Sequence, residues 1–367
     1  MTDIRLQRMA HTIVHYSLGL KKGDRLAIEA GPVAAPLVYE VMHEALRVGA
    51  YPEPFINLPG IRELKLQEAS DEQLAYIPPL QRIIYEEYET LLVISSEENT
   101  RELSGIDPAR MAISQQSGHE LFETFMRRSA EGSLRWCGTL FPTNAYAQDA
   151  NMSLRDFEEF VYNSCFLNNE DPIACWHELS AQQQHFVEYL KGKSSVHILG
   201  QDTDLTLSVA GRTFINSDGK RNFPSGEFFT GPVENSVNGH IRFSFPASYG
   251  GRSVEDVRLR FEEGVVVEAT AAQGQDYLEK MLNMDEGARR LGEFAFGNNA
   301  NVTRCTRNIL FDEKIGGTIH LALGASYPET GGVNQSSLHW DMVCDLRSGG
   351  EVNVDNELFS KDGKFMV

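Results

Sequence analysis

The sequence predicts an N-terminal α/β domain over residues 1–193 and a C-terminal α+β domain, built largely from antiparallel sheet, over residues 194–367. Three observations support this prediction. A chain of 367 residues is long enough for two domains of ~150 residues each. Predicted strands and helices alternate up to about residue 190. Most later segments alternate apolar and polar residues with a period of two, which is typical of antiparallel strands.

Strands and amphipathic helices alternate through the N-terminal half. Arg25–Ala30 is the first predicted strand. The helix that follows carries apolar residues at helical spacing, namely Val38, Val41, Met42, Ala45 and Leu46, and Gly49 ends it. Further strands are predicted at Pro54–Leu58, Leu91–Ser95 and Leu134–Phe141, with a helix over 120–132 between the last two. This order favours a largely parallel sheet.

Hairpins dominate the prediction for the C-terminal half. The runs with period two are 204–210, Ile241–Phe245, Val257–Phe261 and Val265–Ala269. The last two flank the turn Glu262-Glu263-Gly264, so we expect them to form a hairpin. One helix is predicted among these strands, at Gln275–Leu282.

The charge and the cysteines exclude several classes of protein. The chain has 33 Lys and Arg against 52 Asp and Glu, a net charge of −19, whereas nucleic acids and anionic membranes attract clustered cations. We therefore expect no nucleic-acid and no membrane partner. The five cysteines lack C-x-x-C spacing, and the first residues lack the pattern of a signal peptide. Both observations predict a cytoplasmic protein with reduced thiols.

Two glutamates stand at unusual places in the C-terminal half. Glu227 follows a Ser-Gly turn, and Glu293 is the single charge in the apolar run 291–297. Two strand-like segments nearby add further metal-binding groups. In the run 316–324 the apolar residues share one face and leave His320 on the other, among small residues. In the run 336–344 His339 and Asp341 point together, away from the apolar face.

The combined charge of these groups suits a pair of metal ions. Two divalent cations carry four positive charges; Glu227, Glu293 and Asp341 supply three negative charges, and a bridging hydroxide supplies the fourth. Imidazole and carboxylate ligands suit Zn, Co, Mn or Fe better than Ca, which prefers oxygen ligands. A two-metal site of this kind activates water and polarises a carbonyl, which is the chemistry of a hydrolase.

Each of these residues also has a purely structural interpretation. A single strand histidine is more often a hydrogen-bonded core residue than a ligand, and His339 with Asp341 could form only an orienting contact. Glu227 could cap a turn, and Tyr327, which precedes a proline, could simply pack. The charges at 312–314 are interpreted as a charged turn, and the other eight histidines as surface or core residues.

The segments resemble the M29 family of metalloaminopeptidases, the aminopeptidase T group. The motifs that carry the resemblance are SGEFFTGPVENSVNG, DEKIGGTIHLALG, SYPETGG and HWDM. The resemblance implies a homodimer that acts on peptides with a free N-terminus, with Tyr327 as the active-site tyrosine. It also implies two divalent metal ions per chain, such as Zn, Co, Mn or Mg, and the metal ligands Glu227, Glu293, His320, His339 and Asp341.

The expected function is therefore a metal-dependent aminopeptidase, in which a water activated by two metals attacks the N-terminal peptide bond. Glu293, alone in its apolar run, is expected to bridge both metals, Tyr327 to donate a hydrogen bond to the oxyanion, and Glu234 is a candidate for binding the substrate amine. One alternative is a mononuclear iron ring-cleaving dioxygenase on the same scaffold, which would not need the two glutamates. Another is a non-catalytic peptide-binding scaffold.

Overall fold

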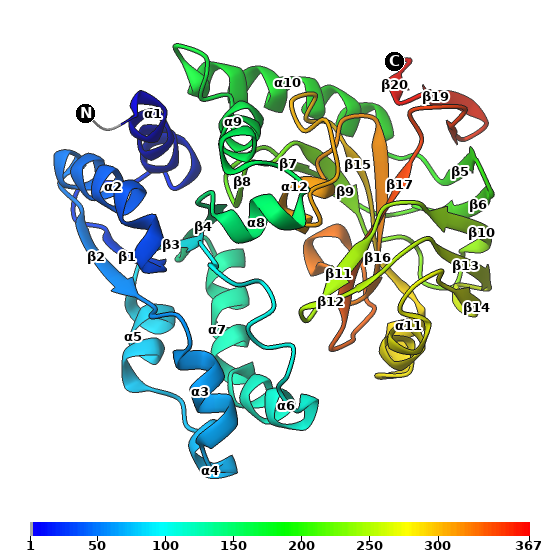
Figure 1. Ribbon diagram of the computed structural model, residues 1–367. Helices are drawn as coiled ribbons and strands as arrows, with labels where there is room; N and C mark the ends of the chain where they lie inside the picture. The colour runs from blue at the N-terminus through cyan, green and yellow to red at the C-terminus, as the bar shows by residue number, and fades with distance from the viewer. Residues whose placement is uncertain (1–2) are drawn as a thin grey trace. The chain divides into compact units, whose positions relative to one another are not determined.

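The computed structural model describes residues 3–367 and divides them into two compact units (Figure 1). The N-terminal unit contains residues 3–173 and Gly219–Pro224. The C-terminal unit contains Ala174–Asp218 and Ser225–Val367. No helix within residues 3–367 is long and apolar enough to cross a membrane.

A five-stranded parallel sheet forms the centre of the N-terminal unit, in the order β2-β1-β3-β4-β8. Its strands are β1 (Arg25–Ala30), β2 (Tyr51–Ile56), β3 (Thr90–Ser95), β4 (Arg135–Leu140) and β8 (Asn222–Phe223). The predicted parallel α/β arrangement is confirmed. β2 begins earlier than predicted and contains Pro52 and Pro54, which an edge strand tolerates because one of its sides needs no hydrogen-bond donors.

Helices precede and connect these strands. They are α1 (Ile4–Thr12), continued by the π-helical turn η1 (Ile13–Ser17), η2 (Pro32–Ala34), α2 (Ala35–Val48), α3 (Ile61–Glu68), α4 (Asp71–Leu74), α5 (Pro79–Glu87), α6 (Pro108–Ser117), α7 (His119–Ala130), α8 (Asn144–Asp149) and α9 (Leu154–Ser164). α2 ends as predicted, because Gly49 takes the left-handed conformation with φ 86° and its N–H bonds back to the last turn.

Antiparallel sheets dominate the C-terminal unit, as predicted. Eight strands follow the order β14-β13-β10-β6-β5-β18-β19-β20, five follow β17-β16-β15-β9-β7, and β11 pairs with β12. The strands are β5 (Ser195–Gly200), β6 (Thr203–Ser208), β7 (Ile215–Ser217), β9 (Glu227–Thr230), β10 (Asn238–Phe243), β11 (Ala247–Tyr249), β12 (Arg252–Val254), β13 (Val257–Glu262), β14 (Val265–Thr270), β15 (Leu291–Gly297), β16 (Thr318–Gly324), β17 (His339–Asp345), β18 (Glu351–Val354), β19 (Glu357–Lys361) and β20 (Lys364–Phe365). The helices are α10 (Pro172–Leu190), α11 (Gln275–Leu282), η3 (Glu286–Arg289), α12 (Ile309–Asp312) and η4 (Pro328–Thr330).

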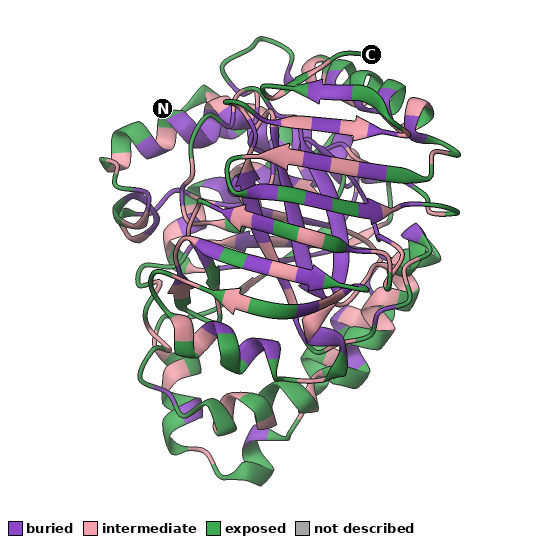
Figure 2. Ribbon diagram, turned by 90° about the vertical axis from the view of Figure 1, so that its right-hand side faces the viewer, coloured by how far each residue is buried: buried purple, intermediate pink, exposed green. Residues whose placement is uncertain are grey.

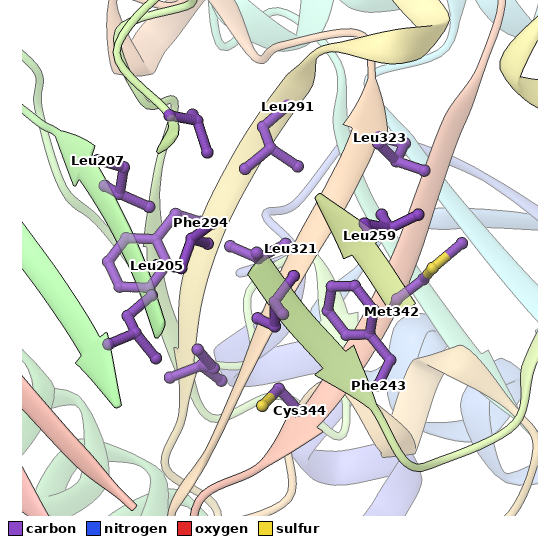
Figure 3. Close-up of a cluster of buried hydrophobic side chains, with 14 of the residues drawn as sticks. Leu205, Leu207, Phe243, Leu259, Leu291, Phe294, Leu321, Leu323, Met342 and Cys344 are labelled. Carbon is purple, nitrogen blue, oxygen red and sulfur yellow. The ribbon is translucent and has the colours of Figure 1, made fainter. Parts of the chain in front are cut away.

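The hydrophobic core of this unit lies between its two large sheets. Side chains of β6, β10 and β13 meet those of β15, β16 and β17 in one cluster (Figure 3). Buried residues alternate with more exposed ones along β6 and β13 of the eight-stranded sheet, whereas every residue of β15 and β16 is buried (Figure 2). Both faces of the five-stranded sheet β17-β16-β15-β9-β7 are therefore covered: one packs in the hydrophobic core, and the other lies opposite the core.

The long helix α10 belongs mainly to the C-terminal unit, although the sequence placed it before a boundary near residue 193. Phe186 and Leu190 on this helix join the hydrophobic cluster of the sheets, and Gln183 donates a hydrogen bond to the backbone carbonyl of Glu227. These tertiary contacts cannot be inferred from the sequence of the helix alone. Because of them, the C-terminal unit begins at Ala174, before the predicted boundary near residue 193.

Candidate metal centre

The five predicted ligands come together on one face of the sheet β17-β16-β15-β9-β7, the face opposite the hydrophobic core. They are Glu227 on β9, Glu293 on β15, His320 on β16, and His339 and Asp341 on β17. Small residues lie between them in the strand register: Ala295 pairs with His320, and Ala322 lies between Glu293 and Asp341. The predicted orientation of β16 and β17 is confirmed, because their apolar residues lie in the core cluster.

Glu293 reaches this face because β15 contains a bulge. Leu291 and Phe294 both lie in the core, although residues three apart on a regular strand point to opposite faces. The pairing with β16 shifts register between Leu291 and Glu293, so the strand has one extra residue there. The bulge turns Glu293 away from the core and onto the face that carries His320.

Glu227 is placed by a glycine. Gly226 has φ 118°, a conformation that residues with a side chain rarely adopt. A Cβ atom at this position would also lie 2.6 Å from the Cβ of Asn299. The Ser-Gly-Glu sequence therefore lets the chain pass close to Asn299 and brings the following carboxylate into the sheet.

The side chains form two groups that share Glu293 between them. His320 Nε2 lies 3.4 Å from Glu227 Oε2 and 3.4 Å from Glu293 Oε1. His339 Nε2 lies 3.4 Å from Glu293 Oε2 and 3.6 Å from Asp341 Oδ2. Each oxygen of Glu293 thus faces a different histidine.

This donor set fits divalent metal ions. Two ligand atoms that each lie ~2.1 Å from a tetrahedral ion are ~3.4 Å apart, which matches these separations and is long for a charge-assisted hydrogen bond. Glu227 Oε2 and Asp341 Oδ1 are buried and have no hydrogen-bond partner within residues 3–367. Buried carboxylate oxygens without partners are costly unless a cation binds them.

Backbone contacts fix the orientation of His339. Its Nδ1 lies 2.9 Å from the carbonyl oxygen of Ala325. Because a carbonyl can only accept, Nδ1 must carry the proton, and in the neutral ring Nε2 is then the nitrogen with a free lone pair. That nitrogen faces the carboxylates, which is the arrangement expected of a histidine prepared for a metal.

The carboxylates strongly favour protonated histidines when no metal is bound. Burial opposes the charge of His320, but the hydrogen bond to Glu293 and the charge of Glu227 raise its pKa to about 9. Burial also opposes the charge of His339, and Asp341 and Glu293 raise its pKa to about 10. A metal ion must displace these protons, so binding is expected to release them.

Two further charged residues, Lys314 and Glu313, complete the site, so the sequence interpretation of 312–314 as a charged turn is wrong for both of them. Lys314 is completely buried and donates to Glu227 Oε1 at 2.6 Å and also to Glu313. Glu313 lies close enough to Glu227 and His320 to belong to the same possible metal group. Lys314 adds one positive charge and Glu313 adds one negative charge. The net charge of the protein groups at the site therefore stays as predicted from the sequence.

Tyr327 lies beside the metal groups on the segment after β16. Its ring packs edge-on against His339, with centroids 5.2 Å apart, and contacts Phe229 at 5.5 Å. Burial, together with the charges of Glu293 and Asp341, raises the pKa of Tyr327 well above its usual value. The phenol therefore keeps its proton at neutral pH and can donate a hydrogen bond.

Glu234, the predicted partner of the substrate amine, is engaged elsewhere. Arg212 Nη2 lies 2.5 Å from its Oε2, and the backbone N–H of Val333 donates to its Oε1 at 2.7 Å. With both oxygens occupied and its charge balanced by an arginine, Glu234 offers no free carboxylate to an ammonium group.

Comparison with known proteins agrees with this geometry. Residues 2–365 match the family described as thermophilic metalloprotease (M29). The chain belongs to the M29 family. Its membership confirms the expected class, a hydrolase that uses metal, and disfavours the dioxygenase and the non-catalytic scaffold.

Relatives of this M29 metalloprotease match it over nearly their whole length. Aminopeptidase 2 of Geobacillus stearothermophilus is 30% identical, with 98% of this chain and 95% of the relative covered. Aminopeptidase T of Thermus thermophilus is 28% identical, with 95% and 94% covered. The structure of wild-type AmpT from Thermus thermophilus superposes with a TM-score of 0.86 at 25% identity, covering 99% of both chains.

Proposed function

We propose that this M29 metalloprotease is an aminopeptidase that hydrolyses the N-terminal peptide bond of peptides by means of two divalent metal ions. The observation that carries the proposal is the position of Glu293, whose two oxygens each lie 3.4 Å from a different histidine nitrogen. A carboxylate in this position is suited to bridging two ions. The names of the relatives, which are aminopeptidases, support the choice of substrate.

The ligands are proposed to be Glu227, Glu293, His320, His339 and Asp341, as the sequence predicted. When bound, two divalent ions supply an activated water and a Lewis acid for the scissile carbonyl. Zn, Co, Mn and Mg are the candidate ions, since imidazole and carboxylate ligands suit the first three especially well. The sharing of Glu293 between two groups favours two ions per chain over one.

The protein's own groups hold and polarise the reacting atoms. Lys314 holds one oxygen of Glu227, so that the other faces His320. Ala325 fixes the ring of His339. Tyr327, protonated and next to His339, is proposed to donate a hydrogen bond to the oxyanion that develops in the transition state. The homodimer and the cytoplasmic location stay predictions.

Metal analysis combined with peptide hydrolysis tests this function. We expect about two divalent ions per chain, release of the first residue from aminoacyl-anilides, loss of activity after chelation, and recovery when metal returns. Peptides with an acetylated N-terminus should not be cleaved. Equal cleavage of acetylated peptides, or activity that survives complete metal removal, would contradict the aminopeptidase proposal. One iron per chain with oxygen-dependent ring opening would support the dioxygenase instead.

Substitution of the shared carboxylate tests the bridge. Glu293→Gln should abolish activity and lower the metal content, because an amide carries no charge and only one of its two atoms can bind a cation. Glu279→Gln on the exposed side of α11 serves as a control and should retain both properties. Full activity of Glu293→Gln with both ions retained would refute the assignment.

A further inference from the structure

A second group of metal-binding side chains lies in the N-terminal unit. His11 on α1, His15 on η1 and Glu44 on α2 present ligand atoms that all lie within 4.8 Å of one another. The two histidines are four residues apart, and this spacing places both rings on one side of a helix. Their ring centroids are 4.3 Å apart. The spacing is present in the sequence, but Glu44 comes from another helix, so the sequence alone does not single it out.

The distances in this group suit a metal ion better than hydrogen bonds. His11 Nδ1 and His15 Nε2 each lie 3.3 Å from the same atom, Glu44 Oε2. Charge-assisted hydrogen bonds between nitrogen and a carboxylate are usually about 2.7–2.9 Å long. Ligands of a tetrahedral zinc ion, each ~2.1 Å from the metal, are ~3.4 Å apart.

Glu44 is held in position by an arginine on its own helix. Arg47 Nη1 donates to Glu44 Oε1 at 2.5 Å, and Oε2 is left to face the two imidazoles. The carboxylate is therefore oriented before any metal arrives. Its side chain is only 16% exposed, whereas those of His11 and His15 are 53% and 38% exposed. An ion there would be reached directly from solvent.

The backbone between the histidines departs from α-helical geometry. α1 ends at Thr12, and Ile13–Ser17 form a π-helical turn that contains His15. Such turns are rare and occur frequently at functional sites, where they change the direction of a side chain. Ile13 and Val14 are fully buried, so the turn is anchored while His15 stays at the surface.

We propose that His11, His15 and Glu44 form a zinc site at the surface of the N-terminal unit, with water completing the coordination, and that it joins α1 to α2. Two histidines and one glutamate are a known zinc ligand set that leaves one position open. Cu²⁺ and Ni²⁺ also favour imidazole and are expected to compete. This site is separate from the proposed catalytic centre, which lies entirely in the C-terminal unit.

Counting bound zinc tests the proposal. Wild-type protein titrated with ZnCl₂ against a chromophoric chelator should bind one equivalent more than His15→Ala, however many ions the catalytic centre takes. The matched control is His119→Ala, which removes a histidine that also contacts an acid four residues away, Glu123, but has no third ligand beside it among residues 3–367. We expect His119→Ala to bind as much zinc as wild type, and His15→Ala to keep wild-type peptidase activity.

The location of the extra ion is tested by amide hydrogen exchange. Zn²⁺ should slow exchange along α1 in wild type, but not in His15→Ala or in Glu44→Gln, which removes the charged ligand without touching η1. If His15→Ala fails to fold, Glu44→Gln provides the same comparison. Equal zinc binding and equal protection of α1 in wild type and the variants would overturn the proposal and leave an ordinary ion-paired cluster.

Discussion

At the scale of single residues, Glu227 depends on the buried Lys314 for its orientation. Lys314 Nζ lies 2.6 Å from Glu227 Oε1 and also contacts Glu313. Burial alone would disfavour its charge, yet the two carboxylates raise the pKa of Lys314 above its usual value. The lysine therefore stays charged and contacts both acids without occupying the Glu227 oxygen that faces His320.

Lys314→Met should destabilise the protein by about 3–5 kcal/mol, because it leaves buried carboxylates without their cation. It should also reduce metal retention at Glu227. Urea unfolding and metal analysis measure the two effects. Lys193→Met, which removes a partly exposed lysine paired with the exposed Glu357, is the control and should change neither. Wild-type stability of Lys314→Met would show that water or another cation replaces the lysine.

Tyr327→Phe should lower kcat by about 100-fold or more and leave KM and metal content nearly unchanged, because the lost donor acts on charge that exists only in the transition state. The phenyl ring can still pack against His339 and Phe229. Steady-state kinetics with an aminoacyl-anilide measure the split between kcat and KM. An unchanged kcat would show that the Tyr327 hydroxyl does not act in the mechanism.

At the scale of elements, β16 carries two separate sets of residues on its two faces. Ile319, Leu321 and Leu323 belong to the hydrophobic core, whereas His320 and Ala322 belong to the metal face. Changes on the two faces should therefore have different consequences.

Ala322→Val should reduce metal content and activity with little loss of stability, since the added methyl groups enter the space between Glu293 and Asp341. Leu321→Ala should cost about 2–5 kcal/mol of stability through the cavity it leaves, while the folded fraction retains its metal. Urea unfolding and metal analysis of the two variants give the comparison. If both variants lost stability and metal together, the two faces would not be independent.

Strand periodicity explains why much of the site could be predicted from sequence. The faces of β16 and β17 follow from residues two apart, which is local information. The position of Glu293 could not be derived in this way, because it depends on a bulge defined by the pairing of β15 with β16. Lys314 and Glu313 were missed for a similar reason: their burial is set by strands that are distant in sequence.

At the scale of the whole molecule, metal and protons compete to stabilise the C-terminal unit. Without metal the pKa values of His320 and His339 are about 9 and about 10, above the usual value of 6.5. A raised pKa of a histidine means that its protonated form stabilises the fold. That contribution is complete below about pH 6.5 and is lost as the pH rises through 9 to 10.

The metal-free protein should therefore lose thermal stability between pH 7 and pH 10, whereas the metal-loaded protein should lose much less over the same range. Burial raises the pKa of Asp341 only to about 6, so its ionisation is nearly complete before this range begins. Thermal unfolding with and without chelator, at intervals of one pH unit, measures the difference. Parallel curves would indicate that the histidines are not protonated in the metal-free fold.

The two covered faces of the five-stranded sheet also restrict which mutations evolution can accept. Ligands and core residues occupy alternate positions along β16 and β17, so a point substitution disturbs one set only. Inserting or deleting a single residue inside these strands would exchange the sets, sending acids into the core and leucines into the metal site. Strand lengths should therefore be almost invariant among active relatives, and length variation confined to the connecting segments. The bulge in β15 is an insertion of this type that the fold already contains.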